Sequence, residues 1–372
     1  MRNKLSGFYK KLIVLTLATC AFASASAQDT RLRLGIYGLN HDHISGFFSQ
    51  MKQGKANVVG VYEPSRPLWE KYKKRFNLPD SLYFDDVKKM IAARKPQVML
   101  GYNAVGKHVD IVELCAPLHI PVMVEKPLAA TLTQAKRIEQ LARQYNIRVL
   151  TNYETTWYPS FQYTYDVVNQ DSIGKIRRMV IRDGHRGPKE IGCSPEFLAW
   201  LTDPADNANG AGALNDFGCY GADLATWLMK GQRPTAVTAV AQHYKPSVYP
   251  KVEDDATILV EYPTATASIE ASWNWALNIK DMEVWGEKGV IHAFDGNNVQ
   301  TRLKEGGYNL VNRAKAIPSP NNDPLIYLTA VLRNEIPGTD DQASLKYNMI
   351  AMEILDAAKR SIQTGKRIVL NP

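Results

Sequence analysis

The sequence predicts an α/β fold in which a doubly wound parallel sheet precedes an α+β part with a large, mostly antiparallel open sheet. Short apolar runs alternate with helical stretches over the first part of the chain, as in βαβ units. After about residue 152 the runs lengthen, alternate in polarity and become rich in aromatic and β-branched residues. The 372 residues suffice for about two domains, which we place at 28–150 and 151–372.

Residues 1–27 have the composition of a cleaved signal peptide. Four basic residues precede an apolar run at 12–23, and 25–27 supplies the small residues of a cleavage site. The run is too short to cross a bilayer of about 30 Å, so we expect export to the periplasm and no membrane span. A lipoprotein is the less favoured alternative, because Thr19 precedes Cys20 where Gly, Ala or Ser is expected.

Charge and cysteine content exclude several classes of protein. Removal of the four basic residues lowers the net charge from +8 to +4, which is too weak and scattered for nucleic-acid binding. The remaining cysteines, Cys115, Cys193 and Cys219, are odd in number and widely spaced. The sequence therefore predicts neither a disulfide framework nor a zinc-cysteine site.

The elements of the first domain follow from the position of its apolar runs. One helix, at 131–145, has an apolar face and a capping-box spacing between Thr131 and Gln134. Helical segments of this kind separate the strands, which indicates parallel pairing. The predicted strands are 32–37, 56–62, 97–102, 121–124 and 147–150.

The second domain has few predicted helices. A Pro-Thr-Ala turn separates two alternating runs that are typical of a hairpin, so we expect antiparallel pairing. Such a sheet exposes one broad face, which predicts a dimer or tetramer assembled through the sheet. The predicted strands are 176–181, 236–244, 256–262, 266–275 and 282–293, and the predicted helices are 213–229, 325–333 and 345–363, the last ended by Gly365.

The segment GIYGLNHDHISG at 35–46 stands where a Rossmann fold has its dinucleotide-binding turn. In that turn the first glycine makes the bend, the second admits the pyrophosphate, and the third lets the helix pack on the sheet. Gly38 keeps the first position, whereas Asn40 and His43 occupy the other two. Asn tolerates positive φ, so we expect Asn40 in a nearly left-handed conformation, with His41 and His43 beside the phosphates.

The end of the second predicted strand indicates which dinucleotide binds. Glu63 follows Gly38 by about 25 residues, where a carboxylate accepts hydrogen bonds from both ribose hydroxyls and repels a 2′-phosphate. We therefore expect NAD. NADP is the alternative, because Arg66 could contact a 2′-phosphate.

The histidines of the turn also allow a metal site to be considered. The side chains of His41, Asp42 and His43 would diverge on a turn, and no second cluster of ligands stands out in the sequence. We therefore predict no metal.

Three further motifs stand out in the sequence. They are VMVEKPL at 122–128, SIGKI at 172–176 and GALNDFGCYGAD at 212–223. Together, and in this order, they resemble the Gfo/Idh/MocA oxidoreductases over essentially the whole mature chain. The resemblance implies that Lys126 is the catalytic lysine beside the nicotinamide and that Asp216 binds substrate. Tyr220 stands where most members carry a catalytic histidine.

The resemblance also implies further contacts of the cofactor. Asn103, His108 and Glu125 would border it, and Pro127 matches a motif proline that is often cis. The segment at 101–108 keeps Asn103 and His108 but replaces the Thr-Pro that usually precedes the asparagine.

Oxidation of a secondary hydroxyl needs a base that takes the proton as the hydride leaves. Tyr220 would need a neighbouring positive charge to lower its pKa, and Lys126 would need burial or a neighbouring cation to lower its own. The sequence leaves both residues open as the base.

The expected substrate is a sugar, glycoside or cyclitol. Trp157 offers a flat face to a sugar ring, the loop at 183–190 places His185 and Arg186 as polar contacts, and Asp223 closes the third motif. Because nicotinamide cofactors are scarce outside the cytoplasm, we expect tightly held NAD. Two alternatives remain: an NAD-dependent glycoside hydrolase that works by transient oxidation and elimination, and a non-catalytic sugar-binding protein.

Overall fold

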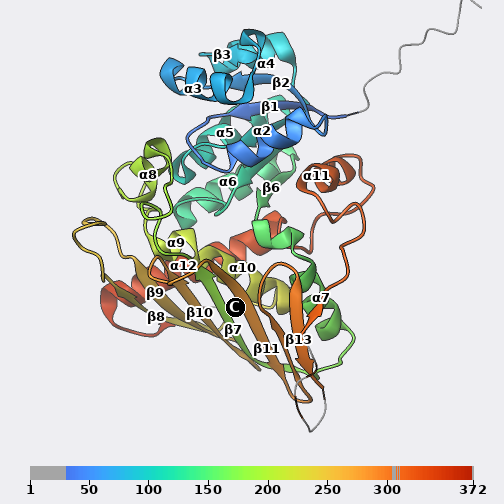
Figure 1. The fold of residues 1–372 in the computed structure, drawn as a ribbon, viewed down its shortest axis with the longest axis vertical. Coiled ribbons are helices and arrows are strands. Elements are labelled where there is room, and N and C mark those ends of the chain that lie inside the picture. The colour runs from blue at the N-terminus through green and yellow to red at the C-terminus, as the bar shows by residue number, and fades with distance from the viewer. Residues whose placement is uncertain (1–30, 304–306, 308, 310, 371–372) are drawn as a thin grey trace, which may run out of the picture. The chain divides into compact units, whose positions relative to one another are not determined.

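The computed structural model describes residues 31–303, 307, 309 and 311–370. The predicted signal peptide at 1–27 lies outside these residues. From Leu32 onward the chain forms one unit that contains two sheets (Figure 1). No helix in the described ranges combines the length and the apolar character that crossing a membrane requires.

The first sheet is the predicted doubly wound parallel sheet. Its six strands are ordered β3-β2-β1-β4-β5-β6, and all neighbours pair in parallel. The pattern missed β3, because two residues are too few to show a period. The strands are β1 (Arg33–Tyr37), β2 (Asn57–Tyr62), β3 (Tyr83–Phe84), β4 (Val98–Gly101), β5 (Val122–Glu125) and β6 (Val149–Asn152).

Helices cover both faces of this sheet. On α6 the Thr131 side chain accepts a hydrogen bond from the Gln134 N–H, as the capping spacing predicts, and Ile138 and Leu141 are buried. One apolar cluster joins the face under α2 and α3 to α11 (Pro324–Leu332). The helices are α2 (Ile44–Lys52), α3 (Arg66–Phe76), α4 (Val87–Arg94), α5 (His108–Cys115) and α6 (Leu132–Tyr145).

The second sheet is mostly antiparallel, as expected. Its order is β14-β13-β12-β11-β7-β10-β9-β8-β15, and β7 with β10 is its parallel pair. The strands are β7 (Ile176–Gly184), β8 (Ala236–Gln242), β9 (Asp255–Glu261), β10 (Thr266–Ser272), β11 (Ile279–Gly286), β12 (Val290–Ala293), β13 (Asn298–Arg302), β14 (Asn312–Arg313) and β15 (Ile368–Val369).

The single strand predicted at 282–293 was wrong. It is a hairpin of β11 and β12, because the Gly286 N–H donates to the Gly289 carbonyl at 2.8 Å and closes a tight turn. The predicted helix at 213–229 is also divided, at Phe217, whose φ of −114° ends one helix before the next begins.

Two helices of the second part, α7 and α8, were not predicted, and each begins with a proline at its first position. The closing helix ends at Gly365 with φ +66°, as expected. The helices are α7 (Pro159–Asn169), α8 (Pro195–Leu201), α9 (Ala213–Asp216), α10 (Gly218–Leu228), α11 (Pro324–Leu332) and α12 (Leu345–Thr364).

Helices α10 and α12 pack on one face of the second sheet, and α12 also contacts α6 and β6 of the first (Figure 1). The opposite face is open. It carries an ionic cluster in which Arg182 pairs with Glu270, Asp281 and Glu283. This face is therefore more polar than its aromatic and β-branched sequence suggests.

Candidate active site

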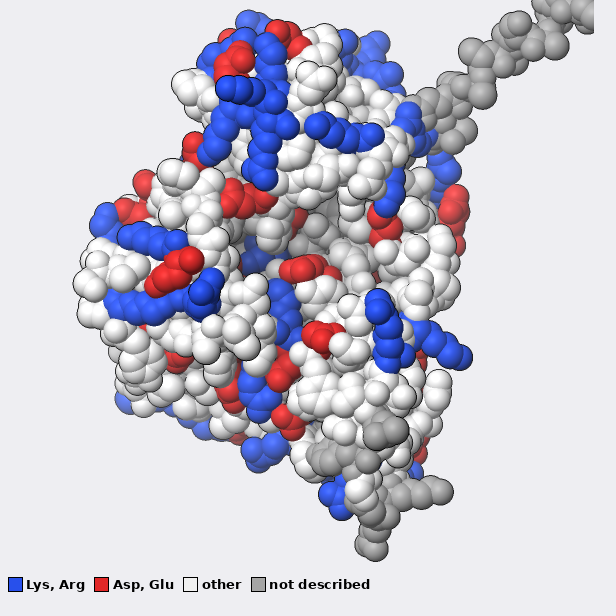
Figure 2. Space-filling model, in the orientation of Figure 1, with Lys and Arg blue, Asp and Glu red and all other residues white. Residues whose placement is uncertain are grey.

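Two adjoining cavities lie at the carboxyl ends of the parallel strands, where ligands bind in open α/β sheets. The larger is about 610 Å³ and the smaller about 430 Å³. Asp42, His43 and Glu154 line both cavities. Figure 2 shows this face of the molecule hollowed at mid-height, with acidic and basic side chains in the hollow.

Gly38 makes the sharp bend after β1. Its φ is +81°, and a Cβ at this position would lie 2.8 Å from the Cβ of Asn103. Its N–H donates to the Tyr62 carbonyl at 2.9 Å. The absence of a side chain thus lets the ends of β1, β2 and β4 meet.

Glu63 fixes the same turn from the end of β2. Its two carboxylate oxygens accept the N–H groups of Leu39 at 2.9 Å and Ser65 at 2.8 Å, and the residue is 4% exposed. Burial raises the pKa of Glu63, while the two N–H bonds oppose that rise. Each oxygen keeps a further lone pair for a ligand hydroxyl.

The conformation predicted for Asn40 was wrong, since Asn40 is not among the residues with positive φ. Its carbonyl accepts the indole N–H of Trp200 at 3.0 Å, which ties the turn to α8. His41 is buried against the rings of Phe197 and Trp200 at 4.8 and 5.5 Å. Burial lowers its pKa well below the usual value, so its imidazole is neutral.

The polar groups around the turn fit a dinucleotide in kind. Both side-chain polar atoms of Asn103 and the side-chain oxygen of Asn40 are buried without a hydrogen-bond partner among the described residues. Buried polar atoms normally have partners, so these atoms point to a polar ligand. Gly38, Asn40, Glu63 and Asn103 are the residues that would hold it.

Lys126 and Asp216 form a buried ion pair between the end of β5 and α9. The Lys126 Nζ donates to Asp216 Oδ1 at 2.6 Å and to the Asp216 carbonyl at 2.8 Å. Trp273 Nε1 donates to the other carboxylate oxygen at 3.0 Å. Burial disfavours the charged form of both residues, but the opposite charge of each partner outweighs this effect. The pKa of Lys126 is therefore raised and the pKa of Asp216 is lowered. The Lys126–Pro127 peptide bond is cis.

Tyr220 presents its ring to two lysines. Lys126 Nζ lies 4.9 Å and Lys280 Nζ 3.6 Å from the ring centroid. Burial, followed by the charges of Glu154 and Asp183, raises the pKa of Tyr220 well above 10, so its phenol stays protonated at neutral pH. The structure thus brings all three predicted catalytic residues to the smaller cavity.

Three functional candidates in this region, namely Glu154, Asp183 and Lys280, were not singled out from the sequence. Lys280 Nζ lies 3.1 Å from Asp183 Oδ1 and 3.6 Å from Glu154 Oε2. Burial raises the pKa of Asp183 to about 7, although Lys280 opposes the rise. Lys280 lies in β11, far from every motif, and no local pattern marks it.

The loop at 183–190 contributes one of its two predicted contacts. His185 lines the smaller cavity, where its Nδ1 accepts the Gly187 N–H at 3.0 Å and its ring meets the Phe217 ring edge-on. Burial lowers the pKa of His185. Arg186 is exposed and lines neither cavity, and its carbonyl accepts a hydrogen bond from Lys245 Nζ.

Several other predicted site residues also line neither cavity: the turn residues Gly38, Asn40, His41, Glu63 and Asn103, and also Asp223 and His108. Asp223 is fully buried in α10 with both carboxyl oxygens unpartnered within the described chain, and burial raises its pKa well above the usual value. His108 is fully buried and its Nδ1 contacts the Pro127 carbonyl at 3.1 Å. It therefore supports the segment after β5 and does not face the cavities.

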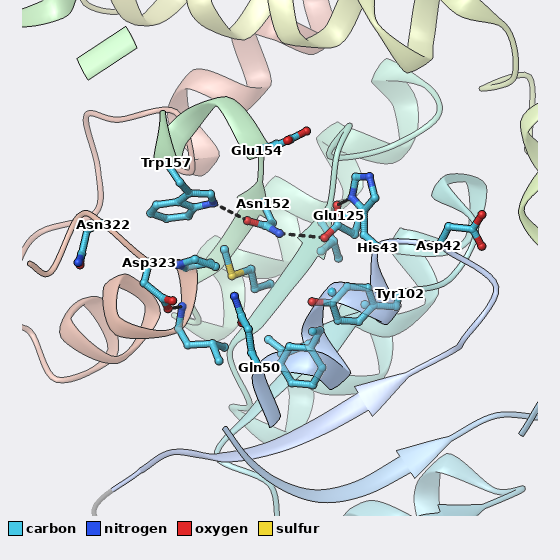
Figure 3. A pocket seen from close by; sticks show the side chains of 18 residues that line it. Asp42, His43, Gln50, Tyr102, Glu125, Asn152, Glu154, Trp157, Asn322 and Asp323 are labelled. Carbon is cyan, nitrogen blue, oxygen red and sulfur yellow. Dashed lines mark hydrogen bonds and ion pairs between the residues drawn. The ribbon is translucent and has the colours of Figure 1, made fainter. Parts of the chain in front are cut away.

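A chain of hydrogen bonds crosses the wall of the larger cavity (Figure 3). Trp157 Nε1 donates to Asn152 Oδ1 at 3.1 Å, and Asn152 Nδ2 donates to Glu125 Oε1 at 2.9 Å. The other oxygen of Glu125 lies 2.8 Å from His43 Nδ1. Trp157 lines this larger cavity, whereas the predicted catalytic residues line the smaller one.

Comparison with known families agrees with this arrangement. Residues 33–153 match the model described as "Oxidoreductase family, NAD-binding Rossmann fold", and residues 161–292 match the GFO/IDH/MocA C-terminal domain. The chain belongs to the Gfo/Idh/MocA oxidoreductase family. Family membership confirms the resemblance carried by the three sequence motifs.

Individual relatives of this Gfo/Idh/MocA protein are distant. Trans-1,2-dihydrobenzene-1,2-diol dehydrogenases of Xenopus laevis and Xenopus tropicalis are 24% and 22% identical over 50% and 59% of the chain. The matched parts span 51% and 63% of those relatives, which is less than two thirds of their length.

Solved structures share the fold at lower identity. The inositol dehydrogenase homolog of Azotobacter vinelandii, complexed with NAD+, matches with a TM-score of 0.77 and 15% identity over 92% of this chain and 98% of that one. The aldose-aldose oxidoreductase of Caulobacter crescentus, complexed with glycerol, has a TM-score of 0.74 and 17% identity over 91% and 100%.

Proposed function

We propose that this Gfo/Idh/MocA oxidoreductase transfers a hydride between tightly held NAD and a secondary hydroxyl of a sugar, glycoside or cyclitol. The observation that carries the proposal is the buried Lys126–Asp216 pair at the wall of a cavity at the carboxyl ends of the parallel strands. When bound, NAD supplies a hydride acceptor or donor. The residues of the protein bind and orient the substrate and handle its proton.

Lys126 would hold the reacting oxygen of the substrate. An ammonium group has three N–H donors, and two of them bond to Asp216, which leaves one for the cavity. That donor stabilises negative charge on the oxygen in the transition state. It is also the proton that Lys126 would give to a carbonyl oxygen as the hydride arrives, and in the reverse direction the neutral amine would take the hydroxyl proton back. Asp216 positions the ammonium group, and Tyr220 keeps its proton as a hydrogen-bond donor.

The lining of the smaller cavity favours a substrate with many hydroxyl groups. Charged and polar groups of Glu154, His185 and Lys280 surround aromatic faces, including that of Phe217. Rings of this kind cover the apolar face of a sugar, while ionic groups bond to its hydroxyls. The position of Glu63 favours NAD over NADP.

Turnover with purified protein tests the proposal. NAD+ and a panel of aldoses, cyclitols and aryl glycosides are supplied, and absorbance at 340 nm is followed. Lys126→Met should lower kcat by about 10²-fold or more and leave the Kd of the dinucleotide nearly unchanged. The exposed Lys175→Met is the matched control.

Three outcomes would contradict the proposal. If Lys126→Met retains the wild-type rate, Lys126 is not needed for turnover and the proposed role of its ammonium group is wrong. Release of the aglycone without a stable keto-sugar selects the elimination route. Sugar binding without any dinucleotide binding selects the non-catalytic alternative.

We also propose that the protein is exported to the periplasm and assembles through the open face of its second sheet. The signal-like composition of residues 1–27 supports export. Leu259 and Trp285, each 39% exposed on that face, support assembly. Fractionation of cells and the molar mass in solution are the respective tests, and a monomer at micromolar concentration would contradict assembly.

A further inference from the structure

The turn after β1 and the end of β5 bring three metal-binding side chains together. One ligand atom from each of His41, His43 and Glu125 lies within 4.8 Å of the other two. The two imidazole rings are 4.5 Å apart, and His43 Nδ1 lies 2.8 Å from Glu125 Oε2. We infer that these residues hold a divalent transition-metal ion of the Zn²⁺ class.

The donor set suits such an ion. Two imidazoles and one carboxylate bind Zn²⁺ at about 2.0–2.2 Å and leave coordination positions open to water or substrate. His41 and Glu125 are 1% and 2% exposed, while the His43 side chain is 42% exposed and lines both cavities. The open positions would therefore face the cavities.

Surrounding residues orient the carboxylate as in known metal centres. Asn152 Nδ2 holds Glu125 Oε1 at 2.9 Å, and Trp157 holds Asn152 in turn (Figure 3). Partners of this kind fix the direction of a ligating group, and their loss commonly weakens metal binding 10- to 100-fold. The oxygen that Asn152 does not hold is the one that faces His43.

Two positive charges oppose the ion: that of the Lys126 ammonium group, which acts on His41, and that of a helix N-terminus. Helix α2 begins at Ile44, directly after His43, and a helix N-terminus carries roughly half a positive charge. The carboxylate of Glu125, 2.8 Å from His43 Nδ1, places a negative charge beside this helix N-terminus and offsets its effect on the ion.

The sequence prediction of no metal rested on the divergence expected of neighbouring side chains on a turn and on the absence of a second ligand cluster. Glu125 supplies the third ligand from a position 82 residues beyond His43, which a sequence pattern cannot reveal. The inference does not depend on hydride transfer, because none of its three residues needs a dinucleotide or a sugar to bind the ion.

Titration of the chelator-treated full chain with Co²⁺ and Zn²⁺, without nucleotide or sugar, tests the inference. We expect one ion per chain and visible Co²⁺ absorption bands. Glu125→Gln and His43→Asn should each weaken binding at least tenfold, and Asn152→Ala about tenfold. The exposed His119→Asn, whose ring contacts the Tyr145 carbonyl, is the matched control and should bind as wild type.

Two results would overturn the inference: no stoichiometric binding by the wild type, or equal binding by Glu125→Gln and His43→Asn. Thermal unfolding of each metal-free variant separates loss of the site from loss of the fold. His43 is half-exposed, so its variant should fold even where the buried Glu125 variant does not.

Discussion

Asp216 and Asp223 are both buried, but their surroundings differ. Asp216 faces Lys126 and accepts the Trp273 indole N–H, whereas the oxygens of Asp223 have no partner within the described chain. Removing one partner from a buried ion pair costs about 3–5 kcal/mol, because the other charge is left buried and unpaired. The two aspartates therefore form a matched pair of positions.

We expect Asp216→Asn to lower the free energy of unfolding by about 3–5 kcal/mol and to abolish turnover. Asp223→Asn should change both far less, since burial already keeps that carboxyl protonated. Urea denaturation and kcat measured on both variants check this. A large loss of turnover in Asp223→Asn alone would contradict it.

Single residues also show what sequence can predict about the site. Lys126, Asp216 and Tyr220 were predicted because they fall within family motifs. Lys280 was not, because its role arises from β11 pairing beside β7, which brings it to Asp183. Asp223 shared a motif with Asp216, but the helix turns its side chain away from both cavities.

At the scale of elements, the bend after β1 depends on one backbone conformation. Gly38→Ala should destabilise the protein by about 1–3 kcal/mol, because a residue with a Cβ is strained at φ +81° and would also press on Asn103. Dinucleotide affinity should fall with it. Denaturation and nucleotide titration measure the two effects.

Gly46→Ala in α2 is the control for that substitution, since nothing lies within 4 Å of a Cβ added there. Alanine favours a helix over glycine, so this variant should be equal in stability or slightly more stable. Equal stability of Gly38→Ala and the wild type would contradict the assigned role of the bend.

Elements with a clear period were predictable, and short or interrupted ones were not. The five longer strands of the first sheet and α6 follow directly from apolar spacing. The hairpin of β11 and β12 reads as one apolar run, since its turn is only the short segment around Gly286 and Gly289. Helix α8 is a seven-residue element whose role, covering His41, depends on tertiary contact.

At the scale of the whole molecule, Lys359 joins three segments. From α12, its Nζ donates to the carbonyls of Ala130 and Asn209 at 3.0 and 3.1 Å. Burial lowers the pKa of Lys359 to about 8, although Glu253 opposes the shift. The folded protein therefore binds this proton less tightly than the unfolded chain does.

This shift predicts a dependence of stability on pH. Between about pH 8 and 10.5 the folded state has lost the proton and the unfolded state retains it, so the contribution of Lys359 to stability rises with pH. Lys359→Met lacks this rise. The difference in free energy of unfolding between wild type and variant, measured at pH 7.5 and 10, should grow in favour of the wild type.

A pH-independent difference would contradict the assignment. Tyrosines and cysteines also titrate over this pH range, but both proteins contain them, so their contributions cancel in the difference between the two free energies of unfolding. Lys175→Met, an exposed substitution, should show no such change.

The bond from Trp200 to the Asn40 carbonyl gives the molecule an intrinsic optical probe. Indole emission depends on what its N–H contacts. This N–H donates to the backbone of the turn after β1, where a dinucleotide or a metal ion would bind. Fluorescence of the wild type, corrected by a Trp200→Phe protein, would therefore record the arrival of either ligand without a label. The residue that covers the turn can thus report when the turn is engaged.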